Sequence, residues 1–214
     1  MAVMPMFPLG TVLLPGAVLP LHVFEDRYRQ MFRELLADDA NPLEFGVALI
    51  TRGRDAGGGD ERAMVATAAR VLDMQVTDDG RYVLAAVGTD RLRVNAWLPD
   101  DPYPIADVDV WVDDDRRALD DRSDDLDELM ARIGEAHRRV DEINELAAQL
   151  GEATPPPTEI SDDPVLAAYH LGSLAPIGSA DRFKLLDAPG LGARLDVLDA
   201  ALDDAAAVLE FRRS

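Results

Sequence analysis

The sequence predicts an α+β fold in which a β-rich part is followed by an α-helical part. Over residues 91–98 and 107–112, apolar side chains alternate with polar ones. This period of two is typical of antiparallel strands with one solvated face. In the second half, apolar residues instead recur every three or four positions, which is typical of helices. Because the composition changes near residues 113–122, we expect a β-rich subdomain at 1–115 and an α-helical subdomain at 116–214.

The β-rich part contains several predicted strands and one predicted helix. Two apolar runs, at 11–14 and 18–24, are predicted strands separated by the turn-forming pair Pro15-Gly16. A helix is expected from Glu25 to Leu36, because its apolar residues fall on one face. The Asp79-Gly80 step favours a two-residue hairpin turn. Further strands are expected at 45–51, 64–76, 81–84, 92–98 and 108–112. Together they predict a curled sheet or partial barrel.

Four helices are predicted in the second part. Ser123 is a candidate N-cap of the first, whose apolar stripe runs from Leu126 to Ala147. The run Pro155-Pro156-Pro157 predicts a stiff connection, and Asp163-Pro164 predicts a second helix with proline at its first position. Ser179 is expected to cap the third helix. The fourth is predicted from a leucine and alanine stripe at 191–209.

The composition excludes several classes of function. The 214 residues include 41 acidic and 21 basic side chains, for a net charge of −20, which disfavours binding to nucleic acid or to an anionic membrane. The chain contains no cysteine, so disulfides, thiolate nucleophiles and Cys-ligated zinc are excluded. The apolar N-terminal segment lacks a basic region and is broken by four prolines, which suits neither a signal peptide nor a spanning helix. A cytoplasmic location is expected.

No motif for catalysis or cofactor binding is complete. The sole lysine, Lys184, lies in a predicted helix, which excludes a P-loop and disfavours a serine–lysine dyad. The three histidines are scattered, and His137 is expected to be a packed core residue because it lies on an apolar stripe. The acidic runs 113–115 and 124–127 lack the glycine of a calcium loop and are predicted to be solvated. We therefore predict no catalytic residue, no metal and no cofactor.

A set of short motifs follows the order found in one known family. The first motifs are Phe7-Pro8-Leu9, Leu14-Pro15-Gly16 and the run from Leu19 to Glu25, followed by Arg27-Tyr28. Later ones cover 45–50, 67–71, 88–94, 163–164, 174–177 and 182–186. Through these motifs, which span nearly the whole chain, the sequence resembles the Lon protease N-terminal domain family, also called the LON substrate-binding domain.

The resemblance implies a curled, PUA-like pseudo-barrel of antiparallel strands, followed by an α-helical subdomain. In full-length Lon enzymes this region helps to recognise substrates ahead of an ATPase and a peptidase. Since this chain ends at Ser214, before such parts, the resemblance implies a stand-alone, non-catalytic protein-binding module rather than an enzyme. It would recognise exposed or unfolded segments, as an adaptor or substrate-recognition factor. Its partner would be a protein or peptide, and weak self-association is also considered.

The candidate binding residues lie in the N-terminal motif. We expect them to line a groove where the sheet meets the helical part, since clefts between subdomains commonly hold ligands. They are Leu21, His22, Phe24, Arg27 and Tyr28. One alternative is a small-molecule or RNA binder, because PUA-like barrels elsewhere recognise RNA, although the net charge argues against it. A second alternative is a cryptic hydrolase whose residues meet only in the fold.

Overall fold

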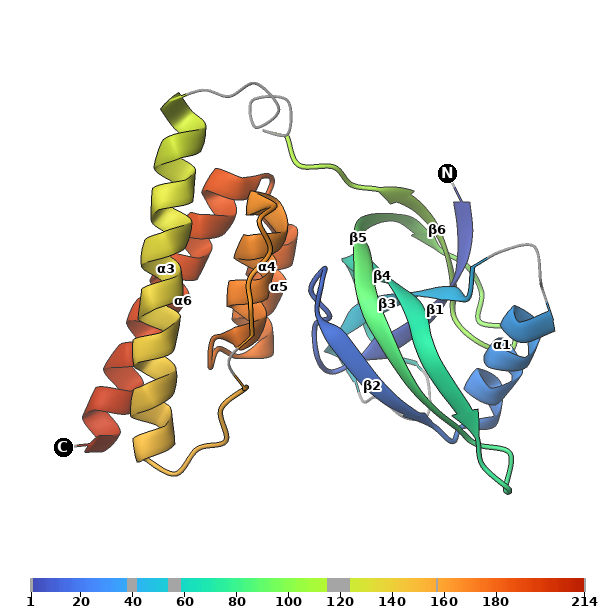
Figure 1. Cartoon of the computed structure of the whole chain (residues 1–214). Helices are drawn as coiled ribbons and strands as arrows, with labels where there is room; N and C mark the ends of the chain where they lie inside the picture. The colour runs from blue at the N-terminus through green and yellow to red at the C-terminus, as the bar shows by residue number, and fades with distance from the viewer. Residues whose placement is uncertain (1, 38–41, 54–58, 115–123, 157, 214) are drawn as a thin grey trace. The chain divides into compact units, whose positions relative to one another are not determined.

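The computed structural model describes residues 2–37, 42–53, 59–114, 124–156 and 158–213. The chain divides into two compact units, Met1–Trp111 and Val112–Ser214 (Figure 1). The first unit is β-rich and the second is α-helical, which confirms the predicted α+β class. The predicted subdomain boundary at residue 115 lies outside the described residues and stays a prediction.

The helices and strands follow the predicted order except at residues 2–14 and 81–98. The described part of the β-rich unit contains β1 (Ala2–Leu9), β2 (Val18–Val23), α1 (Asp26–Ala37), β3 (Glu44–Arg52), β4 (Glu61–Val76), β5 (Tyr82–Trp97) and β6 (Ile105–Val110). The described part of the helical unit contains α3 (Asp124–Gln149), α4 (Pro164–Leu174), α5 (Ser179–Asp187) and α6 (Leu191–Arg213).

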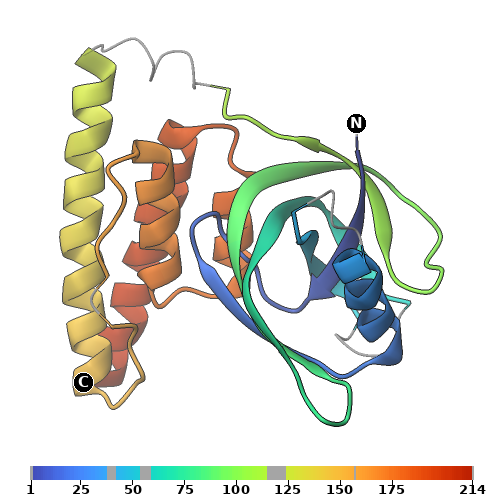
Figure 2. The ribbon, with the colours of Figure 1, turned by 45° about the vertical axis from the view of Figure 1, so that its right-hand side comes forward.

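The strands of the β-rich unit form one mixed sheet that curls into a barrel (Figure 2). The strand order is β2-β5-β4-β3-β1-β6, and an additional pairing of β5 with β6 closes the ring. The long strand β5 makes this possible, because its first half pairs with β2 and its end, Leu92 to Trp97, pairs with β6. β1 and β3 are parallel, since β2 and α1 form a crossover between them. The prediction of an entirely antiparallel sheet is wrong at this one pairing.

The N-terminal segment differs from the prediction in two places. Residues 2–9 form β1, where no strand was expected, and residues 11–14 lie outside the sheet although a strand was predicted there. Leu13 and Leu14 are nevertheless buried, and the Thr67 hydroxyl donates a hydrogen bond to the Leu13 carbonyl at 2.6 Å. A short apolar run indicates burial, but it does not distinguish a strand from a buried loop.

The segments 81–84 and 92–98, predicted as separate strands, belong to the single strand β5. The turn before β5 contains Gly80 at a φ of 74°, the positive φ that the Asp-Gly step predicts. Thr77 N–H donates to the Arg81 carbonyl at 2.9 Å, and Gly80 N–H donates to the Thr77 carbonyl at 2.8 Å. The hairpin loop therefore has three residues rather than the predicted two: a tight turn is followed by a left-handed glycine.

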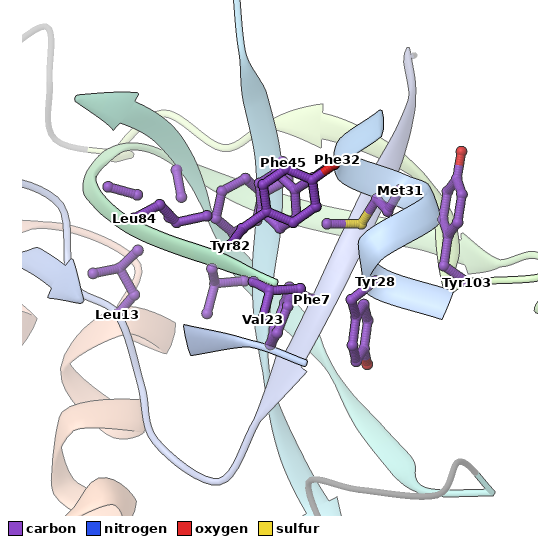
Figure 3. Packing of buried hydrophobic residues seen from close by; sticks show 13 residues of the cluster. Phe7, Leu13, Val23, Tyr28, Met31, Phe32, Phe45, Tyr82, Leu84 and Tyr103 are labelled. Atoms are coloured by element: carbon purple, nitrogen blue, oxygen red, sulfur yellow. The ribbon is translucent and has the colours of Figure 1, made fainter. Parts of the chain in front are cut away.

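A hydrophobic cluster between α1 and the strands forms the larger part of the barrel core (Figure 3). Phe7 and Tyr28 stack with their ring centroids 4.1 Å apart, and Phe32 meets Phe45 edge-on at 5.3 Å. The rings come from β1, α1 and β3, and each is no more than 8% exposed. Aromatic packing of this kind adds to the burial of apolar area, so this cluster holds α1 on the sheet.

In the helical unit, α3 packs against α6 and α4, and α5 packs against α6. Asp163 caps α4 as predicted, because its carboxylate accepts from the backbone N–H groups of Val165 and Leu166. The N-cap of α5 is Gly178, so the prediction that Ser179 caps this helix is wrong. The candidate cap Ser123 and the last proline of the connection, Pro157, lie outside the described residues.

Two predictions about charged or titratable groups in the helical unit are wrong. His137 is 37% exposed, with its Nε2 3.8 Å from Asp141, because it lies at the edge of the apolar stripe and Ala136 takes the buried position. Asp113, predicted to be solvated, is only 5% exposed and forms a bidentate ion pair with the fully buried Arg194, at 2.8 and 2.9 Å. The sequence could not show this pair, because its members are 81 positions apart.

Candidate functional site

The turn that precedes β2 is held in place by a glycine on β5. Leu14 to Ala17 form a tight turn, in which Ala17 N–H donates to the Leu14 carbonyl at 3.1 Å and Gly16 has a φ of 81°. Gly16 N–H donates to the Gly88 carbonyl at 2.8 Å, and Gly88 N–H donates to the Ala17 carbonyl at 2.9 Å. A Cβ at position 88 would lie 2.5 Å from the Leu14 carbonyl oxygen, so only glycine fits there. These contacts determine where β2 begins on the sheet.

The two faces of β2 have different environments. Leu19, Leu21 and Val23 face the core, where Val23 is buried and the two leucines pack against the aromatic cluster. Val18 and His22 lie on the opposite face, with Pro20 between them, and all three are exposed. The alternation follows from the period of two along a strand. β2 therefore carries a row of exposed, mainly apolar side chains, Val18, Pro20 and His22, on the face away from the core.

Strand β5 extends this row into a surface. Its register with β2 pairs Val18 with Val87, Pro20 with Ala85 and His22 with Val83, and directly opposed residues share one face of a sheet. Phe24 follows β2 and is 55% exposed, while Val18 and Val83 are 63% and 46% exposed. We call this surface the apolar face. It consists of Val18, Pro20, His22, Phe24, Val83, Ala85 and Val87.

Three polar residues and the exposed Leu72 border the apolar face along β4. The register of β4 with β5 places Arg70 opposite Val87, Asp73 opposite Ala85 and Gln75 opposite Val83. Arg70 is held by an ion pair with Glu44 at 2.7 Å. An exposed apolar patch with a polar rim is typical of a protein-interaction site.

Pro20 lies at a position that suits an edge strand. Among the described residues, β2 pairs with β5 alone. The backbone carbonyl of Ala17 faces β5, because it accepts a hydrogen bond from Gly88 N–H. Along an antiparallel pair the backbone groups of alternate residues face the partner strand, so those of Pro20 point away from β5. Proline is tolerated where no ladder donor is needed, and it limits uncontrolled strand pairing at an edge.

The structure divides the five predicted site residues between surface and core. His22 and Phe24 belong to the apolar face, and their ring centroids are 6.2 Å apart. Leu21 packs against the core cluster, and Tyr28 is 2% exposed beneath its stacking partner Phe7. Burial raises the pKa of Tyr28, so its hydroxyl stays protonated. Arg27 pairs with Glu25 at 3.1 Å, and its guanidinium lies 4.5 Å from the centre of the Tyr28 ring.

The other members of the apolar face were not predicted from the sequence. The period of two from Val18 to Phe24 would have identified Val18 and Pro20 as partners of His22. Nothing local identifies Val83, Ala85 and Val87, because their place depends on the register of a strand about 65 residues away.

Two hydrogen-bonded pairs, Tyr103 with Glu34 and Lys184 with Asp181, contain groups with shifted pKa values. The Tyr103 hydroxyl donates to the Glu34 carboxylate at 2.5 Å. Burial and this carboxylate raise the pKa of Tyr103 to about 12, and the same hydrogen bond lowers the pKa of Glu34. Lys184 pairs with Asp181 at 2.8 Å, and this hydrogen bond raises the pKa of Lys184. A catalytic lysine base needs a lowered pKa, so Lys184 is unsuited to a dyad.

Within the described ranges, no group of three or more His, Asp or Glu side chains could hold a metal ion. Each helix in the described part of the chain is too short or too polar to cross a membrane.

Comparisons with known proteins agree with the fold and its motifs. The crystal structure of a Lon N-terminal domain protein from Xanthomonas campestris is similar, with 27% identity, a TM-score of 0.61, and coverage of 94% of this chain and 98% of that one. The N-terminal domain of the Mycobacterium avium complex Lon protease has the same fold, with 18% identity, a TM-score of 0.61, and coverage of 95% and 99%. The family model of the ATP-dependent protease La (LON) substrate-binding domain matches residues 3–202, and the chain belongs to that family.

Proposed function

We propose that this chain binds exposed apolar segments of other polypeptides through the apolar face of β2 and β5. The observation that carries the proposal is the exposure of Val18, Phe24 and Val83 along one face, which is bordered on β4 by three polar residues and Leu72. Membership of a substrate-binding domain family supports a polypeptide as the partner. The groove that we predicted between the sheet and the helical part stays a prediction.

The exposed apolar area can contribute to binding. Full burial of a large apolar side chain is worth about 1.5–3 kcal/mol, so covering the exposed half of Phe24 contributes about 1 kcal/mol. Val18 and Val83 add smaller amounts. Because unfolded polypeptides expose apolar side chains that folded ones bury, such a face favours unfolded partners over folded ones.

We further propose that the chain binds its partner without catalysing a reaction, as an adaptor or substrate-recognition factor. The raised pKa of Lys184 supports this, because it removes the one lysine available to a serine–lysine dyad. The cytoplasmic location expected from the sequence is part of the same proposal. Nucleic acid remains an unfavoured partner, because the chain has a net charge of −20.

Anisotropy of a labelled, permanently unfolded polypeptide tests the proposal. The test variant is Phe24→Ser with Val83→Ser, and both positions are exposed enough for the fold to tolerate them. The control is Phe211→Ser with Val110→Ser, which removes equally apolar side chains that are 83% and 59% exposed elsewhere. We expect the test variant to bind about tenfold more weakly, since about 1.4 kcal/mol of apolar burial is lost.

Unchanged binding by the test variant, or an equal loss in the control, would contradict the proposed surface. A gel shift with RNA at low salt tests the nucleic-acid alternative, because electrostatic binding is strongest there. Sedimentation of the test variant and the parent chain shows whether the apolar face also drives self-association.

A further inference from the structure

The helical unit contains a groove with an apolar floor that the proposed function does not use. It has a volume of about 650 Å³ and is lined by one face of α3, by residues 154–156, 158 and 159, and by the end of α4. Its accessible apolar surface comes from Ala148 of α3, from Pro155 and from Leu174 of α4, whereas Val140, which also lines it, is only 1% exposed. The volume falls within the range of small-ligand sites, about 300–1,000 Å³.

The rim of the groove is negatively charged. Asp141, Glu145 and Glu159 line it, and no lysine or arginine does so among the described residues. His137 is the one basic neighbour in the lining, with its Nε2 3.8 Å from Asp141. Glu145 and Glu159 form no ion pair with any described residue.

Carboxylates between α3 and α6 are paired with arginine. Arg132 contacts Asp196 and Asp199 at 2.8 and 2.9 Å, and Arg139 contacts Asp199 at 3.2 Å. The carboxylates of the groove therefore differ from those between α3 and α6, whose charge is compensated within the fold.

Asn144 also lines the groove and contributes an electronegative atom. Its side-chain nitrogen donates to the Leu174 carbonyl at 3.1 Å, which fixes the orientation of the amide. Its side-chain oxygen is buried and accepts no hydrogen bond from the described residues. A buried acceptor of this kind favours positive charge above it.

We propose that this groove binds an arginine or lysine side chain of an extended polypeptide. Long basic side chains combine an apolar stem with a charged end. The stem would lie on Ala148 and Leu174, and the charged end would reach the carboxylates of Asp141 and Glu145. The apolar floor alone would accept any aliphatic residue, but the uncompensated rim selects a cation. This site is separate from the apolar face and adds a preference for basic residues.

Anisotropy at low salt, with two labelled peptides and the full chain, tests this site. One peptide carries two arginines among small neutral residues, and its twin carries neutral citrulline at the same positions. The test variant is Asp141→Asn with Glu145→Gln, at exposed positions of α3. The control is Asp127→Asn with Glu128→Gln, which removes the same charge about 20 Å away along the helix.

We expect the arginine peptide to bind more tightly than the citrulline peptide. Because exposed charge pairs each contribute about 0.2–1 kcal/mol, the test variant should weaken the arginine peptide about three- to tenfold, and the control less than twofold. Phe24→Ser with Val83→Ser should leave this binding unchanged, which separates it from the apolar face.

An equal loss of affinity for the arginine peptide in the test and control variants would overturn the proposal in favour of general attraction to an acidic surface. Loss in the Phe24 and Val83 variant would place the peptide on the apolar face instead. Equal binding of the two peptides would exclude charge recognition. Displacement by spermidine at the same concentration as the peptide would identify a small polyamine, rather than a polypeptide, as the occupant.

Discussion

Replacing Asp113 with asparagine should strongly destabilise the helical unit. The Asp113 carboxylate meets both terminal nitrogens of Arg194, and neither side chain is more than 5% exposed. Arg194 also donates to the Leu185 carbonyl at 3.2 Å, and its guanidinium lies 4.0 Å from the centre of the Tyr169 ring. The substitution keeps the side-chain shape but leaves a buried guanidinium without its counter-charge.

The expected loss is about 3 kcal/mol in the free energy of unfolding. Removing one member of a buried ion pair costs about 3–5 kcal/mol, and asparagine retains one acceptor for Arg194, which favours the lower end. A typical domain is stable by about 5–15 kcal/mol, so this is a large fraction. With a urea m-value of about 1.5 kcal/mol/M, the unfolding midpoint should fall by about 2 M.

Two spectroscopic probes report the two units separately. Both tryptophans, Trp97 and Trp111, belong to the β-rich unit, so their fluorescence follows its unfolding. Far-ultraviolet circular dichroism is dominated by α3, α4, α5 and α6 and follows the helical unit. We expect the urea midpoint measured by dichroism to fall and the midpoint measured by fluorescence to stay unchanged.

Asp114→Asn is the matched control. Asp114 is adjacent and exposed, and its contact to the Pro189 carbonyl uses the backbone N–H, which the substitution retains. A loss below about 1 kcal/mol for Asp113→Asn, or an equal loss in the control, would refute the buried-pair reasoning. A double replacement by apolar residues, Asp113→Leu with Arg194→Met, should recover most of the stability, because no uncompensated charge is left.

Three further predictions concern stability. Gly88→Ala should destabilise the β-rich unit by about 2 kcal/mol, because its Cβ would lie 2.5 Å from the Leu14 carbonyl oxygen. Gly134→Ala should stabilise the helical unit by about 1 kcal/mol, because the space around this position on α3 is open and alanine favours a helix more than glycine does. Urea unfolding of the two variants should show opposite signs, and a neutral Gly88→Ala would contradict the close approach. Burial lowers the pKa of His170 below 6.5, and its Nδ1 accepts from Ser161 N–H at 3.2 Å. The stability of the helical unit should therefore be fully present above pH 6.5 and fall as the pH drops below it. His170→Gln should flatten this dependence, and an unchanged slope would show that His170 is not its source.

Local patterns were sufficient wherever a residue's environment follows from its neighbours in sequence. The period of two along β6 and the three- to four-residue spacing of α3 and α6 identified these elements, because burial of one face imposes that spacing. Asp163 was identified as the start of α4 for a similar reason: a cap and its helix are adjacent in the chain. The same reasoning failed at residues 11–14, where tertiary contacts bury a loop.

The sequence by itself determined the family, the fold class and the approximate positions of most strands and helices, since all of these depend on residue types at short spacing. It also excluded cysteine chemistry and a P-loop. Only the tertiary structure decided that β5 completes the apolar face, that Gly88 supports the turn at Pro15 and that Asp113 neutralises a buried arginine. The physical reason is that each of these contacts joins residues dozens of positions apart. Their energy depends on register and packing, which short-range spacing does not record.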